Sequence, residues 1–165
     1  VNPLRIDQDI LQEWAINTVL FYTDQQHCSA KIIEEQAQNV KKQNSASLEA
    51  MHNVKKEAFR MKNCLLRDEL WELGKALNVS WTNKKKMARN ISNDFIDHIY
   101  ETAMSQGALG GKISGAGGGG FMFFYCPGNT RYAVAENLNA LGVGKVQDFE
   151  FCEQGLVTWS TKGID

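Results

Sequence analysis

The chain has 165 residues, of which 43% are hydrophobic and 22% charged, and its formal net charge is −1. This is the composition of a single globular domain, and so balanced a charge creates no field that would attract nucleic acid or an anionic membrane. No apolar stretch reaches the roughly 18 residues that cross a bilayer, and no signal peptide opens the chain.

Cysteine and histidine usage argues against a disulfide framework and against a metal site. No Cys-x-x-Cys pair occurs, and the histidines are not at ligand spacing. We therefore expect a reducing, cytoplasmic setting and no bound metal. The residues concerned are Cys28, Cys64, Cys126, Cys152, His27, His52 and His98.

The first half of the chain predicts one strand followed by helices. Ala15–Tyr22 has the composition of a buried strand, and no proline interrupts the chain between Pro3 and Pro127. Ser29–Gln43 is polar and helix-forming. Two amphipathic helices follow, whose apolar residues recur every three or four positions. These are Leu48, Met51, Val54, Ala58, Met61 and Leu65 in the first, and Leu70, Leu73, Leu77 and Trp81 in the second.

The second half predicts two further helices and three strands. Ser92 or Asn93 caps a helix that turns Phe95, Ile99 and Ala103 inward and ends at Gly107. The other expected elements are a strand at Phe121–Cys126 buried on both faces, a turn at Pro127-Gly128, a helix from about Thr130 to Gly142, and strands at Val146–Phe151 and Leu156–Thr161. The last of these strands alternates, with Val157 and Trp159 on one face.

We interpret this set of strands and helices as the order strand, helices, strand, strand, helix and strand. That is the split β-α-β order of a ferredoxin-like antiparallel sheet, with a first crossover enlarged to several helices. The predicted fold class is therefore α+β, in one domain over residues 1–165.

A glycine-rich segment is the strongest functional signal. Eight of the 14 glycines lie between Gly107 and Gly120, directly before the apolar strand. Glycine is costly to order, so such a cluster indicates a loop whose backbone approaches a ligand or another backbone closely and whose N–H groups can bind an anion. A flexible linker is the alternative, but linkers do not normally contain a Lys-Ile-Ser core or adjoin an apolar strand.

Two common nucleotide-binding motifs do not fit this segment. A P-loop places its lysine after the glycines, whereas Lys112 precedes them here. A dinucleotide fingerprint can be drawn through Gly115, Gly117 and Gly120, but such a fingerprint opens a helix, and these glycines open a strand.

The string Lys-x-Ser-Gly-Ala-Gly-Gly-Gly-Gly, from Lys112 to Gly120, closely resembles the third conserved motif of the GHMP kinases. The superfamily includes galactokinase, homoserine kinase and mevalonate kinase. Further segments resemble the carboxy-terminal half of its bacterial heptose-phosphate kinase branch, and together they cover most of residues 1–151. They are Leu20–Thr23, Ile32–Gln36, His52–Met61, Trp81–Lys85 with Ile91-Ser92, and Gly107–Lys112.

The resemblance implies a GHMP kinase C-terminal domain, with ATP and Mg2+ as cofactors of the full-length enzyme. In this family the nucleotide is held chiefly by a motif of the type Pro-x-x-x-Gly-Leu-Gly-Ser-Ser-Ala in an amino-terminal domain, which also holds the magnesium carboxylate. No such motif follows Pro3 or Pro127, and no Met precedes Val1. We therefore expect the N-terminal ATP-binding domain to be absent, and the fragment to be inactive and to bind neither cofactor alone.

The resemblance assigns the phosphate side of the cleft to the glycine loop. Its expected site residues are Lys112, Ser114, Gly115, Ala116, Gly117, Gly118 and Gly119. Lys112 either neutralises phosphate or is a solvated strand residue. No catalytic residue is expected within this fragment.

Each of the other candidate residues also has a purely structural interpretation. His52 and Lys55 could line a sugar-phosphate cleft or be surface residues, and Trp81 and Tyr100 could stack on a sugar or belong to the core. The basic run Lys84–Lys86 with Arg89 reads as a solvated helix end. The acids Asp24, Asp68 and Asp97 have no pattern that marks a general base.

The chain departs from the heptose-phosphate kinases after Thr23. They commonly have Thr-Gly followed by an arginine and small hydroxyl residues, where this chain has Asp24-Gln25-Gln26-His27-Cys28-Ser29. An arginine would bind a sugar phosphate bidentately, so its loss leaves a different sugar or sugar phosphate open.

We therefore expect the chain to be the C-terminal half of an ATP-dependent kinase that phosphorylates a hydroxyl of a sugar or sugar phosphate. Within this class, the favoured substrate is a heptose phosphate. The expected partners are ATP, the sugar substrate and the missing N-terminal kinase domain, without nucleic acid or membrane. The alternative is a non-catalytic ferredoxin-like module that binds a small anion or a protein through the glycine loop. A nucleic-acid module would need a basic face, which the charge balance disfavours.

Overall fold

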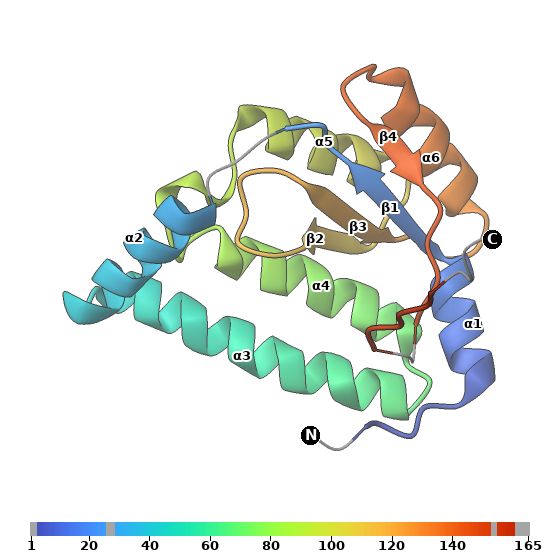
Figure 1. Cartoon of the computed structure of the whole chain (residues 1–165), viewed down its shortest axis with the longest axis horizontal. Coiled ribbons are helices and arrows are strands. Elements are labelled where there is room, and N and C mark those ends of the chain that lie inside the picture. The colour runs from blue at the N-terminus through green and yellow to red at the C-terminus, as the bar shows by residue number, and fades with distance from the viewer. Residues whose placement is uncertain (1–2, 26–28, 153–154, 161–165) are drawn as a thin grey trace.

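The computed structural model describes residues 3–25, 29–152 and 155–160 (Figure 1). Its helices are α1 (Gln8–Ile16), α2 (Ser29–Lys41), α3 (Ser45–Leu66), α4 (Leu70–Lys84), α5 (Asp94–Ser105) and α6 (Thr130–Ala140), with a short 3-10 turn, η1 (Arg89–Ile91). Its strands are β1 (Thr18–Tyr22), β2 (Gly110–Ile113), β3 (Phe121–Tyr125) and β4 (Lys145–Gln147).

The four strands form one antiparallel sheet in the order β2-β3-β1-β4. Figure 1 shows the sheet at the centre, with α3 and α4 along one side of the molecule and α5 and α6 along the other. The predicted α+β class is confirmed. The observed chain order is helix, strand, helices, strand, strand, helix and strand, and its first helix and the strand before the glycine loop were not among the predicted elements.

One face of the sheet carries the main core. Alternate residues of paired strands meet there, as in Val19 opposite Phe124 and Phe21 opposite Met122, and none of the four is exposed. Helices α5 and α6 cover this face with side chains that are also fully buried. These side chains are Ile96, Ile99, Ala103, Val134 and Leu138.

The predicted helices form with the expected ends. The Asn93 side chain accepts a hydrogen bond from the Ile96 N–H at 3.0 Å and so caps α5, and Gly107 follows that helix with φ +102°. Ile99 and Ala103 face inward as predicted, but Phe95 is only half-buried, and its neighbour Ile96 fills the core instead.

The first strand begins later than predicted because a helix precedes it. Ala15 and Ile16 belong to α1, which the sequence analysis missed. Its N-cap is Asp7, whose carboxylate accepts a hydrogen bond from the Asp9 N–H at 3.3 Å. Beyond the helix, the Thr18 hydroxyl donates to the Trp14 carbonyl at 2.7 Å, which fixes the turn into β1.

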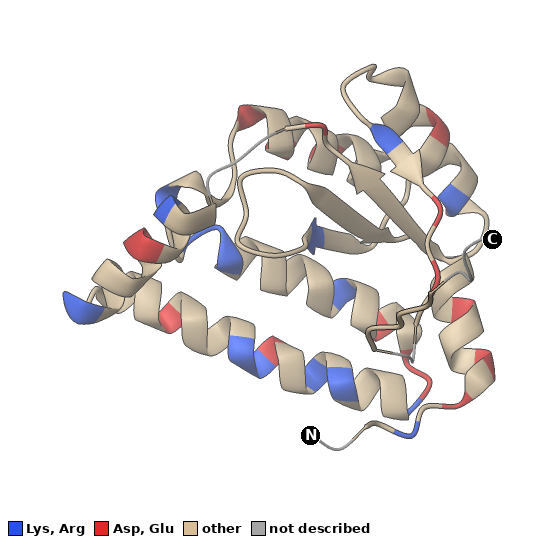
Figure 2. Cartoon of the chain, in the orientation of Figure 1, with Lys and Arg blue, Asp and Glu red and all other residues tan. Residues whose placement is uncertain are grey.

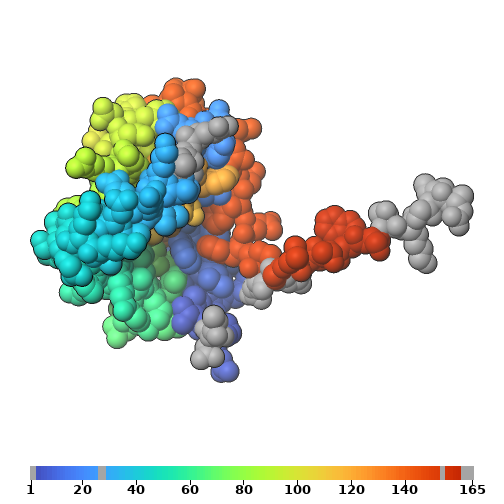
Figure 3. Space-filling model, turned by 60° about the vertical axis from the view of Figure 1, so that its left-hand side comes forward, coloured from blue at the N-terminus to red at the C-terminus, as the bar shows by residue number. Residues whose placement is uncertain are grey.

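The strands predicted near the C-terminal end are shorter than expected or do not form. Of Val146–Phe151 only the first two residues are in β4, and residues 155–160 are not a strand. Leu156 and Trp159 are 96% and 83% exposed, and Figure 3 shows this segment projecting from the body. An apolar alternation makes a strand only where it pairs with a sheet edge, and within the described part of the chain residues 155–160 pair with neither edge strand, β2 or β4. Thr161 lies outside the described residues.

Two further corrections concern the glycine hairpin. Phe121 is 42% exposed, so the strand that it opens is not buried on both faces. The four-residue strand β2 that precedes the loop was not predicted as a separate element. Two of its residues are Gly110 and Gly111, and glycine gives no strand signal.

Candidate anion site at the glycine loop

The loop Ser114–Gly120 joins β2 to β3 in a tight, left-handed path. The Ser114 N–H donates to the Phe121 carbonyl at 2.8 Å and closes its base. Five of its glycines have positive φ: Gly115, Gly117, Gly118, Gly119 and Gly120. A side chain is strained in this conformation, so the run of glycines is a backbone requirement.

The loop is pinned at two points. On one side, the Gly118 N–H donates to the Ile91 carbonyl of η1 at 2.9 Å, and a Cβ on Gly117 would lie 2.8 Å from the Ile91 Cα. On the other side, the Thr23 N–H donates to the Gly120 carbonyl at 2.9 Å. The loop is therefore fixed between η1 and the end of β1 and is not a flexible linker.

Several loop amides are left free by these anchors. Within the described part of the chain, the N–H groups of Gly115, Ala116, Gly117 and Gly119 have no hydrogen-bond partner. Successive free N–H groups in a glycine-rich turn form the kind of concavity that binds anions. Gly115 is exposed and Ala116 half-buried, so their N–H groups are the most open to an anion, whereas Gly117 and Gly119 are buried.

Two lysines bring positive charge to the same place. Lys84, the last residue of α4, donates a hydrogen bond from its ammonium to the Gly115 carbonyl, and it is only 8% exposed. Burial, reinforced by the charge of nearby Lys112, lowers the pKa of Lys84 to about 8. Burial also lowers the pKa of Lys112. In Figure 2 basic residues mark both β2 and the end of α4 that meets the loop.

Lys112 lies in β2, directly before the loop, and its role there stays a prediction. Lys84 was predicted to belong to a solvated helix end, and this prediction is wrong because Lys84 is buried. A signal for Lys84 was present. Positions 70, 73, 77 and 81 form the buried stripe of this helix, and the same spacing continues to Lys84. The spacing therefore placed this lysine on the buried face.

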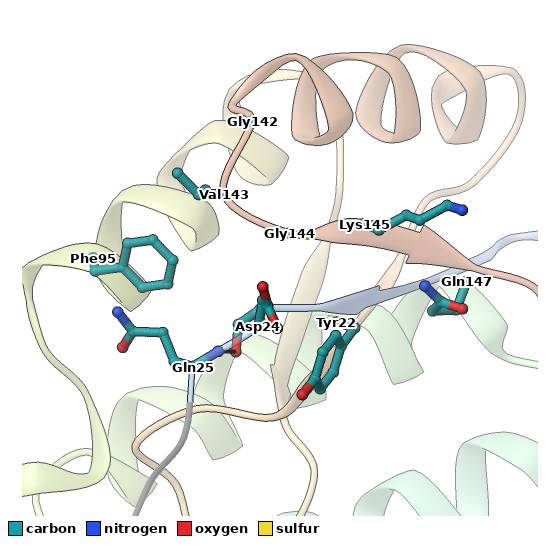
Figure 4. Close-up of a pocket in the computed structure, with 10 residues that line it drawn as sticks. Tyr22, Asp24, Gln25, Phe95, Gly142, Val143, Gly144, Lys145 and Gln147 are labelled. Carbon is teal, nitrogen blue, oxygen red and sulfur yellow. Dashed lines mark hydrogen bonds between the residues drawn. The ribbon is translucent and has the colours of Figure 1, made fainter.

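A polar pocket of about 530 Å³ adjoins the loop (Figure 4). Gln25 connects the two, because a Cβ on Gly119 would lie 2.8 Å from the Gln25 carbonyl oxygen. Tyr22, Asp24, Gln25, Phe95, Lys145 and Gln147 contribute side chains to its wall. Carboxylate, amide and aromatic groups around one cavity suit a polyhydroxylated ligand.

Asp24 stands where the heptose-phosphate kinases commonly have glycine. Its φ is +53°, a left-handed conformation that glycine adopts without strain. The backbone conformation suits a glycine, although the residue itself has changed. The rest of the departure, Gln26, His27 and Cys28, lies outside the described residues.

The remaining candidates do not join the site. His52 and Lys55 are exposed on α3, and neither contributes to the pockets around the loop. Trp81 and Tyr100 are core residues, with ring centroids 6.1 Å apart and the Tyr100 hydroxyl donating to Asn78 Oδ1 at 2.9 Å. The core interpretation of this pair is therefore the one that holds.

Asp97 serves the structure around α5. Its carboxylate accepts from the Lys85 ammonium at 3.0 Å and from the Ser92 hydroxyl at 2.8 Å. Among the described residues, no group of three or more His, Cys, Asp or Glu side chains could hold a metal ion. None of the described helices is long and apolar enough to cross a membrane.

Comparison with known proteins identifies the class. The family model of the GHMP kinase C-terminal domain matches residues 61–144, about half of the chain, and the chain belongs to that family. The match contains α4, β2, the glycine loop and β3, which are the elements that build the anion site.

Individual relatives narrow the resemblance to heptose-phosphate kinases, as the sequence indicated. The chain is 42% identical over 159 residues to D-glycero-alpha-D-manno-heptose 7-phosphate kinase of Campylobacter jejuni, covering 96% of this chain and 46% of the relative. A solved D-glycero-D-manno-heptose 1-phosphate kinase of Bacteroides thetaiotaomicron superposes with a TM-score of 0.65 at 28% identity, over 97% of this chain and 42% of the other. Mevalonate kinase of Leishmania major shares the fold, with a TM-score of 0.68 at 22% identity over 74% of this chain and 37% of the other. The chain thus spans less than half the length of these relatives.

Proposed function

We propose that the chain is the C-terminal half of an ATP-dependent kinase that transfers a phosphoryl group to a hydroxyl of a sugar or sugar phosphate. The glycine loop is the observation that carries this proposal, because its free amides and the two adjacent lysines suit phosphate oxygens. Phosphoryl transfer relies on positioning and on electrostatic stabilisation of the transferring group, and such a loop supplies both.

The site residues in this proposal are those of the loop. The amides of Gly115, Ala116, Gly117 and Gly119 bind phosphate oxygens, and Gly118 holds the loop on η1. Ser114 offers a hydroxyl at the loop's base, and Lys112 neutralises charge. His52 and Lys55, which are exposed on α3, do not line the pockets beside the loop, and their place in a sugar-phosphate cleft stays a prediction.

A second domain completes the enzyme. Bound ATP supplies the phosphoryl group, and Mg2+ neutralises its charge. In this proposal the N-terminal domain would hold ATP and Mg2+, and this chain's part is to bind and orient phosphate. The isolated chain is therefore inactive and requires an N-terminal kinase domain. We further propose that the sheet order is the ferredoxin-like arrangement and that the protein works in the cytoplasm, where its described free cysteines would stay reduced.

A heptose phosphate is the favoured substrate, because proteins of that name are similar to this chain over nearly its whole length. The two names differ in the phosphate position, and the pocket beside the loop carries the acidic Asp24. The pocket suits a sugar phosphate, since Asp24 can accept hydrogen bonds from sugar hydroxyls and the ammonium of Lys145, which also lines the pocket, can pair with a phosphate.

A chimeric enzyme tests the proposal. This chain would replace the matching 46% of the Campylobacter jejuni heptose 7-phosphate kinase, and ATP-dependent phosphorylation of heptose 7-phosphate, heptose 1-phosphate and unphosphorylated sugars would be measured. We expect activity on at least one of them, and none from the chain alone.

Two results would contradict the proposal. A folded chimera that neither hydrolyses ATP nor transfers its phosphoryl group to a sugar would favour the alternative function. In that alternative the chain is a non-catalytic module that binds an anion or a protein through its loop. Turnover by the isolated chain would overturn the need for a second domain.

A further inference from the structure

We propose that Lys84 and Lys112 form a two-lysine site for a phosphoryl oxyanion, with the ammonium of Lys84 held ready on the rim of the glycine loop. The inference rests on the proposed function for the source of the anion, but the site is defined by this chain's own residues. It assigns a role to Lys84, which lies outside the loop motif.

The first argument is the lack of a counterion. Lys75 and Lys85, the neighbouring lysines of the same region, lie 2.7 Å from Glu72 and 3.0 Å from Asp97. Lys84 is buried and Lys112 is half-buried, yet neither has a carboxylate partner within the described part of the chain. A buried ammonium without a counterion is costly, so the arrangement is poised for an anion to enter.

The second argument is the geometry of donors. A lysine ammonium has three N–H donors, and Lys84 uses one on the Gly115 carbonyl. Among the described residues, the N–H groups of Gly115, Ala116 and Gly117 at the same turn have no hydrogen-bond partner. An oxyanion there receives donors from α4 and from the loop backbone together, with Lys112 of β2 directly before the loop.

The third argument is the repulsion between the two amines. The charge of Lys112 adds to burial in lowering the pKa of Lys84, so it raises the cost of the Lys84 ammonium that is bonded to the Gly115 carbonyl. A dianion between them removes that repulsion, whereas a monoanion removes only part of it. The site therefore selects multiply charged groups, such as the phosphates of a nucleotide or the terminal phosphate of a sugar.

Binding of simple anions to the 165-residue chain tests the site. Backbone amide shifts would be followed by NMR during titration with inorganic pyrophosphate in one arm and glucose 6-phosphate in the other. We expect saturable shifts at Gly115–Gly119 in at least one arm. Tighter pyrophosphate binding assigns the nucleotide's phosphates, and tighter sugar-phosphate binding assigns the acceptor.

Matched variants isolate the lysines. We expect Lys84→Met and Lys112→Met each to weaken binding at least tenfold, and Lys84→Arg to retain most of it. Lys86→Met is the control, because Lys86 is exposed two residues further on and should change binding less than twofold. Equal affinities for the Lys84→Met and Lys86→Met proteins, or no binding of either probe, would overturn the inference.

The two proposals fail separately. A chimera without kinase activity, combined with a Lys84-dependent anion site in the chain, removes the proposed function and leaves the site. An active chimera whose KM for ATP and for the sugar are unchanged by Lys84→Met removes the site and leaves the function.

Discussion

Gly110 and Gly115 lie five residues apart in one glycine-rich segment, but a different physical constraint requires glycine at each position. A Cβ on Gly110 would collide with the backbone of α4, at the Gly74 carbonyl and 2.6 Å from the Asn78 nitrogen. A Cβ on Gly115 would meet nothing within 4 Å, and its φ of +89° is the constraint. The strand glycine lets a helix close onto the sheet, and the loop glycine sets a backbone path.

The comparison shows how the site is built. Close packing of α4 on β2 brings the end of the helix, and so Lys84, to the glycine loop. The loop itself then remains open toward solvent at Gly115, where a ligand can approach. The contact between α4 and β2 at Gly110, which we call the foundation, therefore holds in place the exposed end of the loop at Gly115, which we call the rim.

We expect the largest loss of stability from adding a side chain at Gly110, where α4 packs against β2. Gly110→Ala should reduce the free energy of unfolding by about 3 kcal/mol or more, because neither backbone can move without disturbing the sheet or the helix. Urea denaturation measures it. Gly155→Ala is the control, since that position is open, and it should change stability by less than about 0.5 kcal/mol. A mild Gly110→Ala variant would mean that α4 and β2 are not in backbone contact.

Removing the buried charge that this packing creates should have the next largest effect. Lys84→Met should stabilise the chain by about 2 kcal/mol at pH 7, since a pKa depressed from 10.5 to about 8 disfavours the ammonium in the folded state, less the lost hydrogen bond to Gly115. Urea denaturation at pH 7 would measure this gain.

The gain should also depend on pH. Between about pH 8 and 10.5 the folded wild type releases the proton while the unfolded chain keeps it, so wild-type stability rises with pH and the advantage of the variant fades. Burial raises the pKa of Cys126 and of Tyr100 to about 12, which destabilises both proteins alike above about pH 9. Paired urea titrations from pH 7 to 10 would show the difference. A constant difference, like that expected for Lys86→Met, would mean that Lys84 is solvated.

The contrast between Gly110 and Gly115 also explains which parts of the candidate site could be predicted from the sequence. The loop was predictable, because composition alone marks Gly115–Gly120 as a backbone device. The helix was predictable too, since Leu70, Leu73, Leu77 and Trp81 recur at helical spacing. The packing of one on the other was not. It depends on Gly110 facing the Gly74 backbone, and local periodicity carries no information on which glycine meets which helix.

At the rim, a side chain should cost less. Gly115→Ala should lower stability by about 1 kcal/mol, the strain of an alanine at positive φ with no collision to add to it. The same change should impair pyrophosphate binding more than it impairs folding, because the loop amides would shift. Thermal unfolding and the NMR titration measure the two effects. A loss as large as that of Gly110→Ala would erase the distinction between foundation and rim.

The smallest expected effect is a gain from restoring a glycine beside the loop. Asp24 has a φ of +53°, so Asp24→Gly should relieve strain and raise stability by about 0.5 kcal/mol after the entropy of the added glycine is counted. Gln43→Gly is a matched comparison, because Gln43 has a φ of +52° just after α2, outside the pocket beside the loop. We expect both changes to stabilise the chain similarly in urea, and only Asp24→Gly to alter which sugars the chimera accepts. If Asp24→Gly leaves sugar selectivity unchanged, Asp24 is only a tolerated replacement for a glycine at this backbone position. The Asp24 carboxylate then does not contribute to the recognition of the sugar in the pocket.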